Sequence, residues 1–118
     1  MKGGLTVNHT HILIVAGAVV LGVAGFSTAA PTQSEVGVRV FQFRPGQLEV
    51  KAGTTVTWTN QDDITHTVTS GTPDQREGRF DRRLDGKGAT TTVQFKDPGV
   101  YPYFCDKHPS MRGEIRVN

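Results

Sequence analysis

The chain has 118 residues and a formal net charge of +2, with 13 Lys and Arg residues against 11 Asp and Glu residues. That length corresponds to one domain, because domains commonly hold ~100 to 150 residues. The near balance of charge argues against nucleic acid and anionic lipid as partners, since both attract a basic excess. The single cysteine excludes a disulfide bond within the chain.

The first 29 residues have the pattern of an export signal. Lys2 supplies positive charge, residues 12–26 form an apolar run, and residues 27–29 are the small side chains that a signal peptidase reads. We therefore predict a signal peptide at 1–29 and export to the periplasm or another compartment outside the cytoplasm. An alternative stays open, in which residues 12–30 form an uncleaved membrane anchor, because a membrane span needs ~20 mostly apolar residues.

Residues 30–37 are polar and show no periodicity, which predicts a linker, so the folded domain is expected at 38–118. Beyond the linker, short runs of alternating apolar and polar residues are separated by Gly and Pro turns, with no helical period. Such a pattern is typical of an antiparallel β-sandwich. The alternating apolar positions include Leu48 and Val50, Val56 and Trp58, Val93 and Phe95, and Ile115 and Val117.

Two segments depart from simple alternation. Val38 and Val40 share one parity and Phe41 and Phe43 the other, which predicts a bulge or a twist between two sheets. Residues 71–88 intersperse basic and acidic side chains. This segment is interpreted as a solvated connection between strands, with Phe80 and Leu84 able to tuck inward; a docking surface for a redox partner is the alternative.

The strongest chemical signal lies near the carboxyl end. Cys105 is the only cysteine, His108 follows it by three residues, and Met111 follows by three more. A thiolate, an imidazole and a thioether are soft donors, which favour copper over magnesium or calcium. Adding His66 gives two His, one Cys and a weak axial Met, the donor set of a type 1 (blue) copper site. We predict one copper ion that cycles between Cu⁺ and Cu²⁺.

Structural zinc fits these donors less well. Zinc sites of that kind are normally closed by four strong ligands, and methionine is not among them. The remaining histidines, His9 and His11, lie in the leading segment and are not expected to bind the ion. Each donor, taken alone, could have only a structural role, because a lone cysteine or methionine is usually a buried apolar side chain.

The run YPYFCDKHPSMRGEIRV at residues 101–117 resembles the copper-binding carboxyl end of the cupredoxins, with a ligand spacing similar to the amicyanin-like members. The run FRPGQLEVKAGTTVTWTNQDDITHTV at residues 43–68 resembles the family's approach to its first histidine ligand. The resemblance implies an all-β, Greek-key antiparallel β-sandwich and a monomeric electron carrier rather than an enzyme. It also implies that His108 reaches the surface and that redox proteins, such as a dehydrogenase or a c-type cytochrome, dock there briefly.

Some positions differ from the pattern that the resemblance sets. Thr65 stands where Pro is common, Thr67 where Asn is common, and Lys107 where amicyanin-like loops have Pro. By resemblance, Asn60 would tie the two ligand-bearing loops together. Asp106 and Lys107 put charge beside His108, where relatives often show an apolar patch.

Two other functions stay open from the sequence. The chain could deliver copper rather than electrons, or its metal could only reinforce folding. A delivery protein is expected to have a flexible Met- or His-rich segment, and none follows the leader. A multicopper oxidase is excluded, because too few histidines are present for an oxygen-reducing cluster.

Overall fold

The computed structural model describes residues 32–118 and the isolated glycines at 3, 17, 22 and 25. Apart from those glycines, the predicted signal peptide at 1–29, the alternative anchor at 12–30, and His9 and His11 lie outside the described residues. Within the described residues, no helix has the length and apolar character needed to cross a membrane.

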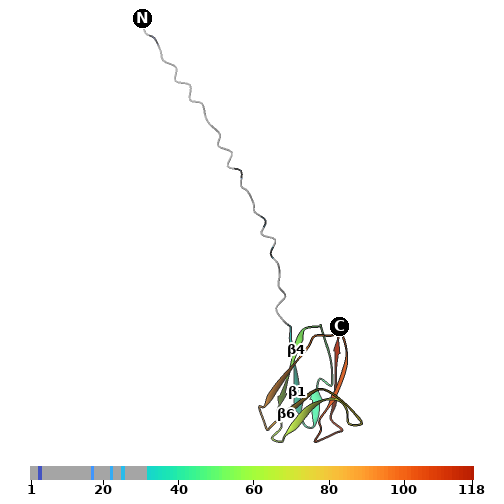
Figure 1. Cartoon of the computed structure of the whole chain (residues 1–118). Helices are drawn as coiled ribbons and strands as arrows, with labels where there is room; N and C mark the ends of the chain where they lie inside the picture. The colour runs from blue at the N-terminus through green and yellow to red at the C-terminus, as the bar shows by residue number, and fades with distance from the viewer. Residues whose placement is uncertain (1–2, 4–16, 18–21, 23–24, 26–31) are drawn as a thin grey trace.

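The described part of the chain folds into nine β-strands (Figure 1). Their bounds are β1 Gln33–Arg39, β2 Gln42–Arg44, β3 Gln47–Val50, β4 Thr54–Asn60, β5 His66–Thr72, β6 Gln75–Leu84, β7 Thr90–Phe95, β8 Gly99–Phe104 and β9 Arg112–Val117. One sheet has the order β2-β1-β4-β7 and the other the order β3-β9-β8-β5-β6.

The two sheets form the predicted all-β sandwich, with one difference from the expectation. Most neighbouring strands are antiparallel, but β1 pairs with β4 and β3 pairs with β9 in parallel. The sheets are therefore mixed. Parallel neighbours arise here because the chain visits the other sheet between β1 and β4, and again between β3 and β9, so no tight hairpin joins these strands.

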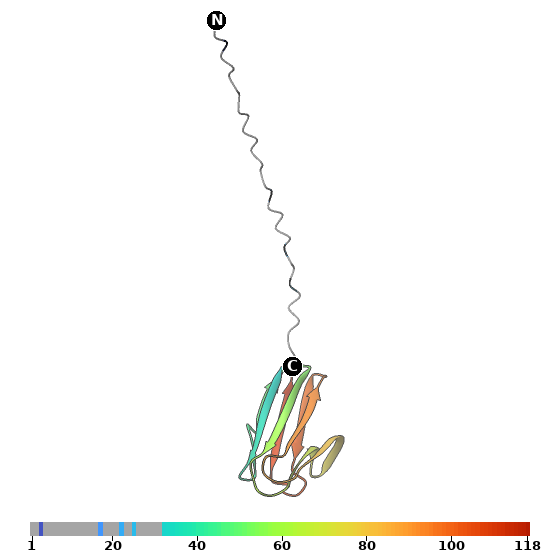
Figure 2. The ribbon, with the colours of Figure 1, turned by 90° about the vertical axis from the view of Figure 1, so that its left-hand side faces the viewer.

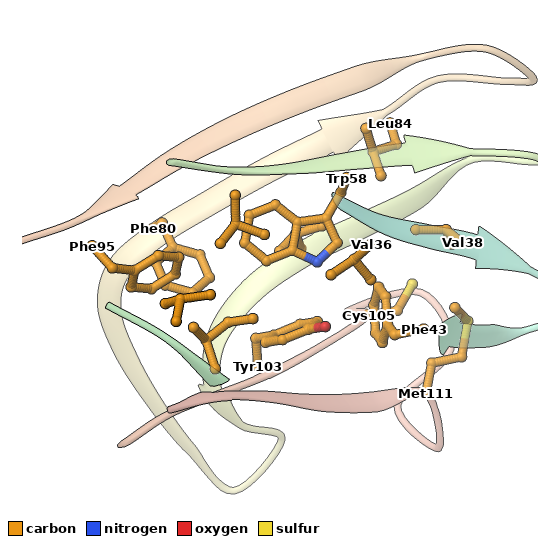
Figure 3. Packing of buried hydrophobic residues seen from close by; sticks show 14 of the residues in the cluster. Val36, Val38, Phe43, Trp58, Phe80, Leu84, Phe95, Tyr103, Cys105 and Met111 are labelled. Atoms are coloured by element: carbon orange, nitrogen blue, oxygen red, sulfur yellow. The ribbon is translucent and has the colours of Figure 1, made fainter. Parts of the chain in front are cut away.

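The core lies between the sheets and follows strand alternation. In β4, Val56 and Trp58 are fully buried and their neighbours are half-buried, as the sequence pattern predicted. Figure 3 shows Trp58 in the middle of the core, Phe80 and Phe95 at one end, and the sulfurs of Cys105 and Met111 at the other. The two sulfur donors therefore project from the packed interior of the sandwich.

The predicted linker is wrong from residue 33 onward. β1 begins at Gln33 and pairs with β4 from Gln33 to Val38, and Val36 is only 1% exposed. Residues 33–37 thus belong to the sheet. This strand was not predicted because Val36 and Val38 are its only apolar residues, and two residues are too few to show the alternation of a strand.

The change of parity near residue 40 also has a different cause from the predicted bulge or twist. Val40 and Phe41 form a two-residue turn between β1 and β2, and both side chains are exposed. Val38 and Phe43 pair across this hairpin, so both point into the core. The reversal of the chain at the turn produces the change of parity.

The charged segment at 71–88 is not a simple connection. It contains β6, a ten-residue strand at the edge of the second sheet. The β5–β6 hairpin, yellow at β6, extends beyond the neighbouring strands (Figure 2). Phe80 and Leu84 are buried, as predicted, whereas the charged side chains of β6 are exposed. Charges on an exposed edge strand discourage pairing with another chain.

Candidate metal centre

Three of the four predicted ligands meet at one end of the sandwich. His66 is the first residue of β5, Cys105 follows β8 directly, and His108 lies in the loop between β8 and β9. Their donor atoms all lie within 4.8 Å of one another. The Sγ atom of Cys105 is 3.8 Å from Nδ1 of His66 and 3.6 Å from Nδ1 of His108. The sandwich body thus supplies one histidine, and a single loop supplies the other two donors.

The loop from Cys105 to Met111 is shaped by its own backbone. The amide of His108 donates to the carbonyl of Cys105 at 3.2 Å, and the amide of Met111 donates to the carbonyl of His108 at 2.8 Å. The amide of Cys105 in turn donates to the carbonyl of Met111 at 3.1 Å. Each three-residue step from one donor to the next is therefore closed by a backbone hydrogen bond.

Met111, the predicted fourth donor, lies in the same region as the other three. Its side chain is 2% exposed and belongs to the apolar core that includes Cys105. In Figure 3 the two sulfurs lie at the same end of the core, beside Phe43. Burial of a thioether in this place suits a weak axial donor, because water is kept from competing with it.

The separations between the sulfur of Cys105 and the two histidine nitrogens fit a metal ion bound by all three donors. Bonds of ~2.1 Å to nitrogen and ~2.3 Å to sulfur, as first-row ions such as zinc form, put two donors about 3.8 Å apart when they diverge by ~120°. The observed distances of 3.8 and 3.6 Å from sulfur to the two nitrogens match this value. Two imidazoles, one thiolate and a nearby thioether are the donors of a type 1 copper site, so these residues fit copper.

The second nitrogen of His66 fixes which ring nitrogen can bind. Its Nε2 atom lies 2.8 Å from Oδ2 of Asp62. A carboxylate accepts hydrogen bonds, so Nε2 carries the proton and Nδ1 is left with the lone pair that faces Cys105. Partners of this kind orient metal-binding histidines.

Asp62 carries a negative charge in this setting. Burial raises the pKa of its carboxyl group, but hydrogen bonds from Val40, His66 and Phe41 outweigh that effect and lower the pKa below its usual value. The carboxylate is therefore ionised at neutral pH, next to a fully buried histidine.

Thr67, and not Asn60, ties the two ligand-bearing segments together. The amide of Thr67 donates to Sγ of Cys105 at 3.3 Å, and its hydroxyl accepts from the amide of Asp106 at 2.7 Å. The predicted link through Asn60 is wrong. Its side-chain amide instead donates to the carbonyls of Ile64 and Leu84, because it is buried below the loop that leads to His66.

The two histidines differ in exposure. His66 is fully buried, whereas His108 is half-buried, as the resemblance implied. Asp106, Lys107 and Pro109 around it are exposed. Asp106 forms an ion pair with Arg76 on β6, so part of the charge beside His108 is neutralised.

Comparison with known protein families agrees with this geometry. Residues 30–118 match the family described as copper binding proteins, plastocyanin/azurin family. The chain belongs to this cupredoxin family. Copper is accordingly its cofactor, as one ion in a type 1 site.

Individual cupredoxins show how far the similarity extends. The chain is 34% identical to amicyanin-alpha of Methylorubrum extorquens over 89 residues, which is 75% of each chain. It is 32% identical to the chloroplastic plastocyanin of Tetradesmus obliquus over 118 aligned positions, covering 87% of this chain and 80% of that one. Among solved structures, a purple cupredoxin from Nitrosopumilus maritimus superimposes with a TM-score of 0.66 at 28% identity, covering 72% of this chain and 99% of that one.

Sequence reasoning missed three residues around this cupredoxin site. Asp62 contacts His66, Thr67 contacts Cys105, and Phe41 lies edge-on to both histidines. For Thr67 a signal was available, since a hydroxyl directly after a ligand can replace a side-chain amide there. For Phe41 no signal was available, because the turn that carries it is far from both histidines in the sequence.

Proposed function

We propose that this chain is a small electron carrier whose copper is held by four side chains: His66, Cys105, His108 and Met111. The observation that carries the proposal is the preset cluster of His66, Cys105 and His108, with donor atoms within 4.8 Å of one another. When bound, copper supplies a couple that accepts and returns one electron at a time. The protein's part is to hold the donors still.

Contacts around the four donor side chains hold them in fixed positions. His66 sits on a strand and is held by Asp62, and Cys105 receives the amide hydrogen of Thr67. The loop that carries His108 and Met111 is closed by its own hydrogen bonds. Donors that need not move on a change of charge keep the reorganisation barrier low, which favours electron transfer.

The same burial weighs against copper delivery. A protein that hands over an ion needs donors that an incoming ligand can reach. Cys105 and His66 are fully buried, and Met111 is 2% exposed. Among the four proposed donors, only His108 is partly exposed. One partly exposed ring suits passage of an electron better than passage of an ion.

The half-buried ring of His108 supports the proposed point of contact with donor and acceptor proteins. We infer transient docking there, since redox contacts often bury less than ~1,200 Å². The exposed, charged Lys107 and Asp106 would border such a contact. In this role the chain is a carrier and not an enzyme.

Export of the protein is part of the same proposal. A single buried cysteine that binds copper is protected from stray oxidation outside the cytoplasm. We infer that residues 1–29 direct export and are removed. Mass measurement of the protein from a cell fraction outside the cytoplasm tests this: a chain that begins at Ala30 supports it, whereas an intact leader in the membrane fraction favours the anchor.

Charge placed beside His108 should slow electron exchange between two copies of the protein. Pro109→Lys adds a positive charge to a face that already carries the exposed Lys107, so repulsion between the two copies should slow exchange by roughly tenfold at low salt. Line broadening in nuclear magnetic resonance spectra of mixed oxidised and reduced protein gives the rate. Val100→Lys is the matched control, because Val100 is 58% exposed at the far end of β8. Equal slowing by both changes would refute the His108 route.

Replacing the proposed axial donor should change the reduction potential without removing the colour. Met111→Leu keeps a buried apolar side chain but removes a sulfur that favours the oxidised ion, so the potential should rise. A tenfold loss of preference for Cu²⁺ over Cu⁺ corresponds to a rise of about 59 mV for one electron. Redox titration followed by visible absorption measures it. An unchanged potential would remove Met111 from the ligand set.

A further inference from the structure

The turn between β1 and β2 has a conformation that its own residues disfavour. Val40 and Phe41 occupy its two central positions with φ values of +52° and +56°. Two-residue hairpin turns of this kind favour Asn-Gly or Asp-Gly, because both central residues need positive φ. A β-branched valine in the left-handed region is an outlier, so contacts outside the turn must hold it there.

Asp62 provides those contacts. Its Oδ1 atom accepts the amide hydrogen of Val40 at 2.9 Å, and Oδ2 lies 3.4 Å from the amide nitrogen of Phe41. The same Oδ2 accepts the Nε2 hydrogen of His66 at 2.8 Å. One carboxylate thus joins the strained turn to the buried histidine.

The Val40–Phe41 turn places the ring of Phe41 against His66 and His108. The Phe41 ring is edge-on to His66, with centroids 5.7 Å apart, and edge-on to His108 at 5.0 Å. The two histidine rings are 5.1 Å apart. Phe41 is 51% exposed, so part of its ring faces solvent while the ring also contacts both histidines.

We propose that Asp62 is a positioning residue that sets the orientation of His66 directly and, through the Val40–Phe41 turn, packs Phe41 against both histidines. This inference rests on the proposed copper site. A negative carboxylate bonded to the imidazole makes Nδ1 a stronger donor, which favours the more highly charged Cu²⁺ and lowers the reduction potential. The backbone strain persists at this place because the carboxylate satisfies two amides and one ring hydrogen together.

The first test compares two neighbouring carboxylates. Asp62→Asn keeps the size of the side chain but removes its charge and its strong acceptor for Nε2. We expect the potential of the copper-loaded protein to rise by about 59 mV, which corresponds to a tenfold loss of preference for Cu²⁺. Asp63→Asn removes the same charge one residue away, from an exposed side chain, whereas the carboxylate bonded to His66 is that of Asp62, so this change should shift the potential far less. Equal shifts would overturn the proposal.

The second test uses the metal-free protein and so does not depend on copper. The Nε2 hydrogen of His66 should exchange slowly with solvent in the wild type and in Asp63→Asn, and at least tenfold faster in Asp62→Asn. Unchanged exchange in Asp62→Asn would overturn the proposal. If instead the wild type binds no copper while this protection is seen, the proposed function fails and the positioning role of Asp62 stands.

A third test uses a variant of the turn, in case the Asp62→Asn protein alone does not fold. Val40→Gly removes the strain at the β-branched residue of the turn, so the turn depends less on Asp62 for its shape. Asp62→Asn in the Val40→Gly background should fold and still raise the potential, because the negative charge on the partner of His66 is lost in either background. A potential equal to that of Val40→Gly alone would show that Asp62 acts only on the turn.

Discussion

Replacing Cys105 with serine will abolish the intense visible absorption of the copper-loaded protein. The band requires a bond between copper and a thiolate, and Cys105 is the only cysteine in the chain. No other sulfur can take its place, because a thioether such as that of Met111 carries no negative charge. Visible spectra of both proteins at equal copper content measure the effect.

The fold should survive this change, which separates loss of the ligand from loss of structure. Serine is close to cysteine in size, and its hydroxyl can still accept the amide hydrogen of Thr67. The free energy of unfolding of the metal-free protein should fall by no more than about 1–3 kcal/mol, the range for a poorly satisfied buried polar group. Chemical denaturation of the metal-free proteins supplies this control. A Cys105→Ser protein that keeps its colour would refute the site.

Replacing Trp58 with alanine should cause the largest loss of stability. The side chain is fully buried between the sheets, 5.4 Å from the Tyr103 ring and 6.3 Å from the rings of Phe80 and Phe95. Removal of a large aromatic side chain from a core costs about 3–5 kcal/mol, because the cavity closes only in part. That is a large share of the ~5–15 kcal/mol that holds a typical domain. Denaturant unfolding of metal-free protein measures it.

Tyr103→Phe is the matched control for Trp58→Ala. Tyr103 is buried beside Trp58, and its hydroxyl and the Trp58 indole nitrogen have no partner with hydrogen-bond geometry. Burial raises the pKa of Tyr103 to about 12, an effect that the adjacent indole only partly offsets. Removing a buried hydroxyl that has no partner should be nearly neutral or stabilising. A cost below about 1 kcal/mol for Trp58→Ala would contradict the central place given to this side chain.

Strand alternation made much of the fold predictable. Val56 and Trp58 of β4 lie in the core as expected, because a half-buried strand shows a period of two residues. β6 was missed since charged residues occupy both of its faces, as an exposed edge strand allows. The start of β1 was missed because its pairing with β4 links distant segments, which no local pattern reveals.

The donor set was predictable for a different reason. Cys105, His108 and Met111 lie on one short loop, so a few consecutive residues of the sequence are enough to recognise them as metal donors. His66 was found by exclusion, because the other two histidines, His9 and His11, lie in the predicted signal peptide. The residues that orient these donors were not found: Asp62, Thr67 and Phe41 act through contacts that depend on how three separate loops meet.

Titration of the purified, metal-free protein with copper, followed by visible and electron spin spectra, tests the central claim most directly. We predict saturation at one copper per chain, with an intense visible band that disappears on one-electron reduction and returns on re-oxidation. Saturation at another stoichiometry, a colourless oxidised complex, or a copper ion that cannot be reduced and re-oxidised would contradict an electron carrier built on His66, Cys105, His108 and Met111.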